Sequence, residues 1–158
     1  MYMRQNIQRG ITLVEAMIAL LVISVGLLGI ASLQLTAMNQ NTSSLHNSQA
    51  VWYAYNMSDR IRANIGEFDT YKNKDTATST PKDCEGFYCN PKDMVNSDIA
   101  DWATMVGNLP GGRGMIGFNA DGLLINVMWD DNGTGVTGTG CDPDEPADLT
   151  CYTLVVAE

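Results

Sequence analysis

The chain has 158 residues, of which 45% are hydrophobic and 17% are charged, a length typical of one domain. Its net charge is −9, and from residue 11 onward 7 basic side chains face 18 acidic ones, a balance of −11. Nucleic-acid affinity depends on Lys and Arg neutralising phosphates, so this acidic body argues against a direct nucleic-acid partner and a basic membrane-surface module. One histidine and four cysteines leave little for a metal or nucleophile site. The composition favours an interaction protein.

No Asp, Glu, Lys or Arg lies between Glu15 and Asp59, and residues 16–35 are almost wholly apolar. A helix of that length spans about 30 Å, the thickness of a bilayer's hydrocarbon core. Arg4 and Arg9 precede it, so the positive-inside rule predicts a single span with a cytoplasmic N-terminus. A secretory signal peptide would have a shorter apolar core and an A-x-A-like cleavage site, and a plain anchor leaves Glu15 unexplained. A carboxylate in such a segment costs roughly 2–3 kcal/mol, which indicates a function.

Residues 9–15, Arg-Gly-Ile-Thr-Leu-Val-Glu, resemble the class III leader junction of type IV prepilins and type II secretion pseudopilins. In that family a prepilin peptidase cuts after the glycine and methylates the new N-terminal residue. The resemblance therefore implies cleavage between Gly10 and Ile11 and N-methylation of Ile11, although most members have phenylalanine there. The family's fifth mature residue is a glutamate, which corresponds to Glu15.

The resemblance also implies a role for Glu15 in filament assembly. The family's glutamate is thought to meet the N-terminal amine of a neighbouring subunit, which would neutralise two charges in a dry environment and fix the axial register. In the unassembled protein the side chain could instead reach the head-group level, because it lies near the membrane end.

The helical pattern continues beyond the apolar segment. Apolar residues recur at steps of three or four, at Ala50, Ala54, Met57, Ile61 and Ile65. A second strip beside them consists of Leu45, Trp52 and Tyr55. No proline occurs before Pro81, and Gly66 has the position of a C-cap, so the pattern predicts one helix from Ile11 to Ile65. By the resemblance, residues 1–10 are a cleaved leader, 11–35 the transmembrane and filament-core half of this helix, and 36–158 a globular head that includes its second half.

The rest of the chain predicts a small α+β head. Residues 66–96 are loop-like, and a short helix is expected over 97–107, with Ser97 as N-cap and Ile99, Trp102 and Val106 on one face. Strands are expected at 114–118 and 123–129 around a turn at 119–122, and at 152–157 after an acidic loop at 130–150. A long N-terminal helix packed on a small antiparallel sheet is the type IV pilin fold that the resemblance implies.

Four cysteines predict two disulfides in an oxidising periplasm, and the sequence allows three pairings. We favour Cys84–Cys89 and Cys141–Cys151, because each closes a loop in a region with little core to hold it. Each bond would contribute roughly 2–3 kcal/mol by restricting the unfolded chain. The second is similar to the disulfide-bounded C-terminal region of many pilins.

Other motifs do not indicate a cofactor, a metal or an enzyme. The cysteine spacings are not those of zinc ligands, and the acidic residues of 130–148 lack EF-hand spacing, so a solvated loop is favoured over a calcium site. Residues 133–138 match G-x-G-x-x-G, but no helix is expected after them. No Ser/His/Asp or Cys/His arrangement stands out. We therefore expect no cofactor, no metal site and no catalytic residue.

Four segments resemble the PilV-type minor pilins of type IV pili. These are SVGLLGIASLQL (24–35), SDRIRAN (58–64), Asp101-Trp102 followed by LPGGRG (109–114), and Met128-Trp129-Asp130. The resemblance implies a subunit that waits in the bacterial inner membrane with its head in the periplasm. Through the inner-membrane assembly platform it would then enter the pilus, or fimbrium, at the cell surface. There it would prime pilus assembly with other minor pilins and the major pilin, at or near the tip, where a tip adhesin is a further partner.

Two other functions remain open from the sequence. A type II secretion minor pseudopilin shares this N-terminus and fold, although the corresponding pseudopilin usually has a smaller head. A competence pilin for DNA uptake would need DNA contacts, for which a cluster around Lys72, Lys74 and Lys82 offers the local basic charge.

Overall fold

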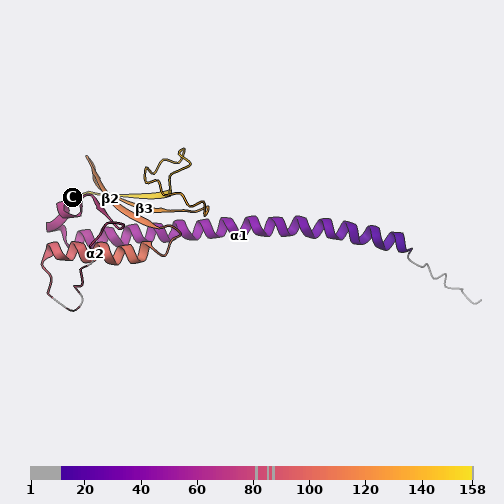
Figure 1. The fold of residues 1–158 in the computed structure, drawn as a ribbon, viewed down its shortest axis with the longest axis horizontal. Helices are drawn as coiled ribbons and strands as arrows, with labels where there is room; N and C mark the ends of the chain where they lie inside the picture. The colour runs from indigo at the N-terminus through magenta and orange to yellow at the C-terminus, as the bar shows by residue number, and fades with distance from the viewer. Residues whose placement is uncertain (1–11, 81, 85, 87, 158) are drawn as a thin grey trace, which may run out of the picture. The chain divides into compact units, whose positions relative to one another are not determined.

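A computed structural model describes residues 12–80, 82–84, 86 and 88–157. Its elements are α1 (Leu13–Ala63), the 3-10 helix η1 (Ile65–Tyr71), β1 (Lys74–Asp75), α2 (Pro91–Val106), β2 (Arg113–Asn119), β3 (Gly122–Trp129) and β4 (Thr150–Val156), as Figure 1 shows. The strands form one antiparallel sheet in the order β1-β2-β3-β4. The long N-terminal helix and the small antiparallel sheet confirm the predicted α+β class. The chain divides into two compact units, Met1–Thr42 and Ser43–Glu158.

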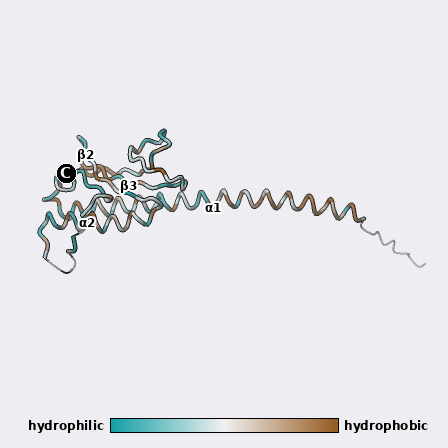
Figure 2. Tube along the Cα trace, in the orientation of Figure 1, coloured by the Kyte–Doolittle hydropathy of each residue, from teal (hydrophilic) through white to brown (hydrophobic). Residues whose placement is uncertain are grey.

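The described part of the first unit is dominated by the apolar start of α1. An 18-residue window of this helix has a mean hydropathy of 2.5 with no residue buried, so the helix is long and apolar enough to cross a membrane. Figure 2 shows brown, hydrophobic residues along this stretch. The Ser24 hydroxyl donates to the Leu21 carbonyl at 2.8 Å, and the Thr36 hydroxyl donates to the Ser32 carbonyl at 3.1 Å. These polar groups are therefore satisfied within the helix, as lipid surroundings require.

The end of α1 differs from the prediction. The helix stops at Ala63 rather than at Ile65, and Gly66 lies inside η1 instead of capping α1. The Asn64 side-chain amide donates to the Pro91 carbonyl at 2.9 Å, which ties this corner to the start of α2. The turn buries Phe68 and Tyr71 and leaves Ile65 49% exposed, so Ile65 is not part of the buried stripe.

Helix α2 begins earlier than the prediction placed it. Asn90 is the N-cap, since its side-chain oxygen accepts a hydrogen bond from the Asp93 amide at 2.8 Å, and Pro91 occupies the first turn. The predicted cap, Ser97, lies in the helix interior and is buried. Residues 66–96 are therefore not a plain loop, because they hold η1, β1 and the first turns of α2.

The predicted hairpin is confirmed. β2 and β3 pair from Arg113↔Met128 to Asn119↔Gly122, and β4 pairs with β3 from Leu123↔Val156 to Trp129↔Thr150. The Asn119 side-chain oxygen accepts a hydrogen bond from the Asp121 amide at 2.9 Å, which stabilises the turn. No sequence pattern predicted β1, a two-residue strand at the edge of the sheet.

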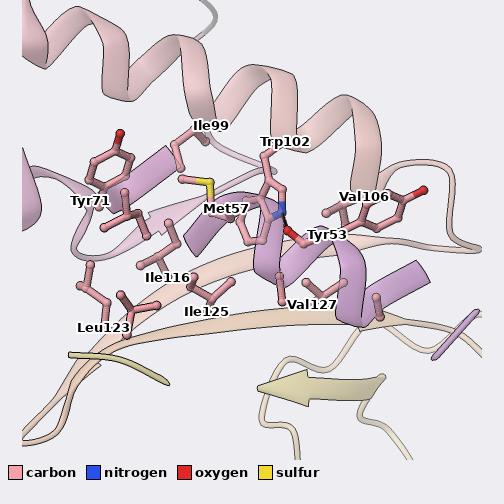
Figure 3. Close-up of a cluster of buried hydrophobic side chains, with 14 of the residues drawn as sticks. Tyr53, Met57, Tyr71, Ile99, Trp102, Val106, Ile116, Leu123, Ile125 and Val127 are labelled. Atoms are coloured by element: carbon pink, nitrogen blue, oxygen red, sulfur yellow. Dashed lines mark hydrogen bonds between the residues drawn. The ribbon is translucent and has the colours of Figure 1, made fainter. Parts of the chain in front are cut away.

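The core lies between one face of the second half of α1, the inner face of the sheet and α2 (Figure 3). It contains the predicted stripe of α1 apart from Ile65, the predicted face of α2, and alternate residues of β2 and β3: Ala50, Ala54, Met57, Ile61, Ile99, Trp102, Val106, Ile116, Leu123, Ile125 and Val127. The Trp102 indole N–H donates to the Tyr53 carbonyl at 3.0 Å, as the dashed line in Figure 3 shows. A Cβ at Gly114 would lie 2.5 Å from the Trp102 ring, so β2 needs glycine where this ring packs.

Candidate functional site

The predicted processing and assembly residues lie at the start of α1. Gly10 and Ile11 are outside the described residues. The Glu15 backbone amide donates to the Thr12 hydroxyl at 3.3 Å, so Thr12 caps the helix and Glu15 lies in its first turn. Within the described ranges the Glu15 side chain is exposed and makes no ion pair. A carboxylate in the first turn is favoured by the helix dipole, and this one is open to a partner from another chain.

The residues that follow Glu15 leave a large apolar surface uncovered. The large side chains from Leu13 to Leu35 are between 54% and 78% exposed in the single chain. A helix that is apolar all round needs lipid or other helices as its surroundings. This surface can therefore serve as a membrane anchor and as a packing surface for other helices.

Asp131 connects α1 to the end of β3. Its carboxylate accepts hydrogen bonds from the Ser43 hydroxyl at 2.5 Å, from the His46 ring at 3.1 Å and from the Trp129 indole N–H at 3.1 Å. Partial burial raises the pKa of Asp131, but these hydrogen bonds outweigh it and hold the pKa below its usual range. From its sequence alone, this residue was expected only to be part of an acidic loop. The Trp-Asp-Asp run at the end of a predicted strand was the available signal.

The neighbouring Asp130 organises the glycine-rich loop. Its carboxylate accepts hydrogen bonds from the Gly135 amide at 2.7 Å and from the amide and hydroxyl of Thr134 at 3.0 and 3.1 Å. The Gly135 and Thr134 amides hold the pKa of Asp130 below its usual range. The G-x-G-x-x-G run is thus a loop folded onto an aspartate, and no helix opens after it.

A second polar network joins α1, η1 and α2. The Arg60 guanidinium lies 2.9 Å from Asp98 and 3.0 Å from Asp101. The buried Tyr71 hydroxyl donates to the other Asp98 oxygen at 2.5 Å, and its burial and the nearby Asp98 carboxylate raise the pKa of Tyr71. Arg60 of the Ser-Asp-Arg run and Asp101 of the Asp-Trp pair therefore help to hold α1 and α2 together.

Both disulfides have the pairing that the sequence favoured. Cys84 and Cys89 are joined with their Cα atoms 5.6 Å apart, and Cys141 and Cys151 with theirs 5.4 Å apart. The second bond fixes the acidic loop to β4. Beside it, Asp142, Glu145 and Asp148 help line a hollow of about 610 Å³.

The groups considered for a metal or for DNA can be located within the described residues. Among the described residues no group of His, Cys, Asp and Glu is arranged to hold a metal ion. Lys72 pairs with Asp69 and also lies over the Phe118 ring, 3.8 Å from its centroid. Lys74 donates to Asn96, and the Lys82 ammonium lies 3.7 Å from Asp93. The three lysines are thus engaged with groups of their own chain.

Comparison with known families identifies two adjoining segments. Residues 5–31 match the model of the prokaryotic N-terminal methylation motif, and residues 32–100 match the model described as type IV pilin Tt1218. Over residues 5–100 the chain is therefore similar to type IV pilins. No curated protein and no solved structure matches the chain.

The pilin match and the fold agree with each other. The methylation motif includes Glu15 and much of the apolar surface, and the Tt1218-like segment runs from the apolar helix through η1 and β1 into α2. Type IV pilins are structural proteins, and a long N-terminal helix with a small antiparallel sheet is their fold. A pilin role is therefore supported, together with a membrane anchor and processing by a prepilin peptidase.

Proposed function

We propose that this chain is a minor pilin of a type IV pilus that enters the filament at or near its tip and promotes pilus assembly. The observation that carries the proposal is the methylation motif continuing without a gap into pilin sequence, on a helix whose first part exposes apolar side chains on every side. Such a helix suits storage in a membrane followed by packing among other helices. Catalysis has no part in this role.

Processing follows from the motif. A prepilin peptidase would cut after Gly10 and methylate Ile11, which places Glu15 fifth in the mature chain. Arg4 and Arg9 lie before the apolar segment, so the leader faces the cytoplasm and the head is periplasmic. The mature protein then remains as a single-pass inner-membrane protein until the assembly platform extracts it.

Assembly in this proposal depends on Glu15. Its side chain is exposed at the start of α1, and lateral packing of apolar helices would remove it from water. A carboxylate in such surroundings needs a positive partner, and the N-terminal amine of a neighbouring subunit supplies one. Hydrophobic packing therefore drives association, and the ion pair selects the register.

Two features support a minor rather than a major subunit. The first half of α1 contains no proline, whereas major pilins often have one there. Three of the four segments that resemble PilV-type minor pilins contribute to these joints of the head, through Arg60, Asp101 and Trp129. Its partners would be other minor pilins, the major pilin and a tip adhesin.

Deleting the chain tests this function. Surface pili and secreted exoproteins are scored in the same strain, with the deleted chain restored on a plasmid as the control. The proposal expects pili to be lost or reduced while secretion continues. Intact pili with lost secretion would instead identify a type II secretion pseudopilin.

A further inference from the structure

One edge of the sheet is open. β4 lies at the end of the strand order and pairs with β3 alone among the strands of the described residues. One side of β4 therefore presents backbone N–H and C=O groups that no strand in the described ranges takes up. Tyr152 and Leu154 pack against the core, while Thr153 and Val155 are exposed. One face of β4 therefore packs against the core, and the other face is exposed.

The two edges of the sheet are built differently. β1 is two residues long and charged, and its Asp75 carboxylate pairs with Arg113. Short length and charge are the usual protection of an edge against pairing with another chain. β4 is seven residues long, with the sequence Thr-Cys-Tyr-Thr-Leu-Val-Val. It has no charge, no proline and no glycine, so it lacks these sequence-borne protections.

A negatively charged hollow lies at the beginning of β4. It is lined by carboxylates and by the first residues of the strand, over a volume of about 610 Å³, and the residues concerned include Asp142, Glu145, Asp148 and Thr150. Within the described part of the chain, none of these three carboxylates forms an ion pair. A lysine or arginine from another chain would find matching charge here.

We propose that the free edge of β4 accepts an extended segment of another protein by strand addition, and that Lys or Arg beside that segment enters the acidic hollow. Backbone hydrogen bonds would supply the affinity. The alternating side chains of the added strand and the basic residues beside it would determine which segments bind. The inference rests on the sheet and holds whether or not the proposed pilin role does.

Charge decides against a second copy of this chain as the occupant. Two heads (residues 36–158) with a balance of −10 each repel one another, and antiparallel pairing of two β4 strands brings no basic flank to either hollow. Within β4 and the twelve residues before it there is no Lys or Arg. The partner is therefore a different chain with a basic flank.

Hydrogen exchange of the full chain in detergent micelles tests the proposal. The probe is the peptide Lys-Lys-Val-Thr-Val-Tyr-Val-Thr-Lys-Lys. Exchange of the outward amides of β4 should slow by the factor 1 + [L]/Kd, on the order of tenfold at about ten times Kd. The α2 amides should exchange at their usual rate.

Two control peptides and a pair of variants make the result specific. A probe with glutamates in place of the lysines, and one with N-methylated alternate amides, should each lose the effect. Val155→Lys adds a charge to the edge and should abolish the slowing, whereas Thr104→Lys adds the same charge to an exposed position of α2 and should keep it. No slowing with the lysine probe, or equal slowing with either control peptide, overturns the proposal. Slowing that rises with protein concentration alone would make a second copy the occupant, and this also overturns it.

Discussion

Replacing Trp102 by phenylalanine should destabilise the head by about 2–3 kcal/mol. Trp102 of α2 is fully buried against α1 and the sheet, and its indole N–H donates to the Tyr53 carbonyl at 3.0 Å. Loss of that hydrogen bond costs about 1 kcal/mol. The smaller ring also removes buried atoms, at roughly 0.8 kcal/mol for each group of methylene size. The two losses together give the expected value.

A second tryptophan provides a matched control. Trp52 lies on the same chain but is 59% exposed, so Trp52→Phe removes the same atoms from the surface and should change stability by no more than about 0.5 kcal/mol. The stability of both variants is measured by urea unfolding of the full chain in detergent. Hydrogen exchange of the β3 amides reports the unfolding. Equal midpoints for the two variants would refute the role given to Trp102 as the joint between α1 and α2.

The remaining predictions concern processing, assembly and pH. Gly10→Val should leave an uncut precursor on an immunoblot, and a mature-size product would exclude the proposed cleavage site. Glu15→Ala should be inserted and processed but yield several-fold fewer sheared pili, while normal piliation would remove its role in register. Asp131→Asn should lower the free energy of unfolding by about 2 kcal/mol at neutral pH, because Ser43 and His46 then lose their charged hydrogen-bond acceptor. The lowered pKa of Asp131 means that its contribution is present at neutral pH and is lost as the pH falls through the unfolded and then the folded value. The variant should therefore show a flatter stability profile between about pH 5 and pH 2 in urea unfolding, and an unchanged profile would contradict this reasoning.

The parts of the fold that follow a periodic or local residue pattern could be predicted from the sequence. The buried stripe from Ala50 to Ile61 follows the helical period, and Ile99, Trp102 and Val106 follow it in α2. The hairpin was found because Asn119 and Gly122 bound a short turn between two β-rich runs. In each case, residues within a few positions of one another determine the local structure.

The parts that depend on distant residues could not be predicted. α1 ends where the Asn64 amide meets Pro91, and β1 forms because Lys74 and Asp75 come to lie beside β2. Asp131 reaches its partners across 85 and 88 residues, and no local pattern marks such contacts. The candidate assembly residue Glu15 was identified through a motif, since the partner proposed for it belongs to another chain.

The most direct test of the account is mass spectrometry of filaments sheared from the cell surface. The chain should be present in the filament fraction, and its N-terminal peptide should begin at N-methylated Ile11 with residues 1–10 removed. Absence from the filaments, or a chain there that still begins with its leader, would contradict the proposal that this protein is a processed pilus subunit.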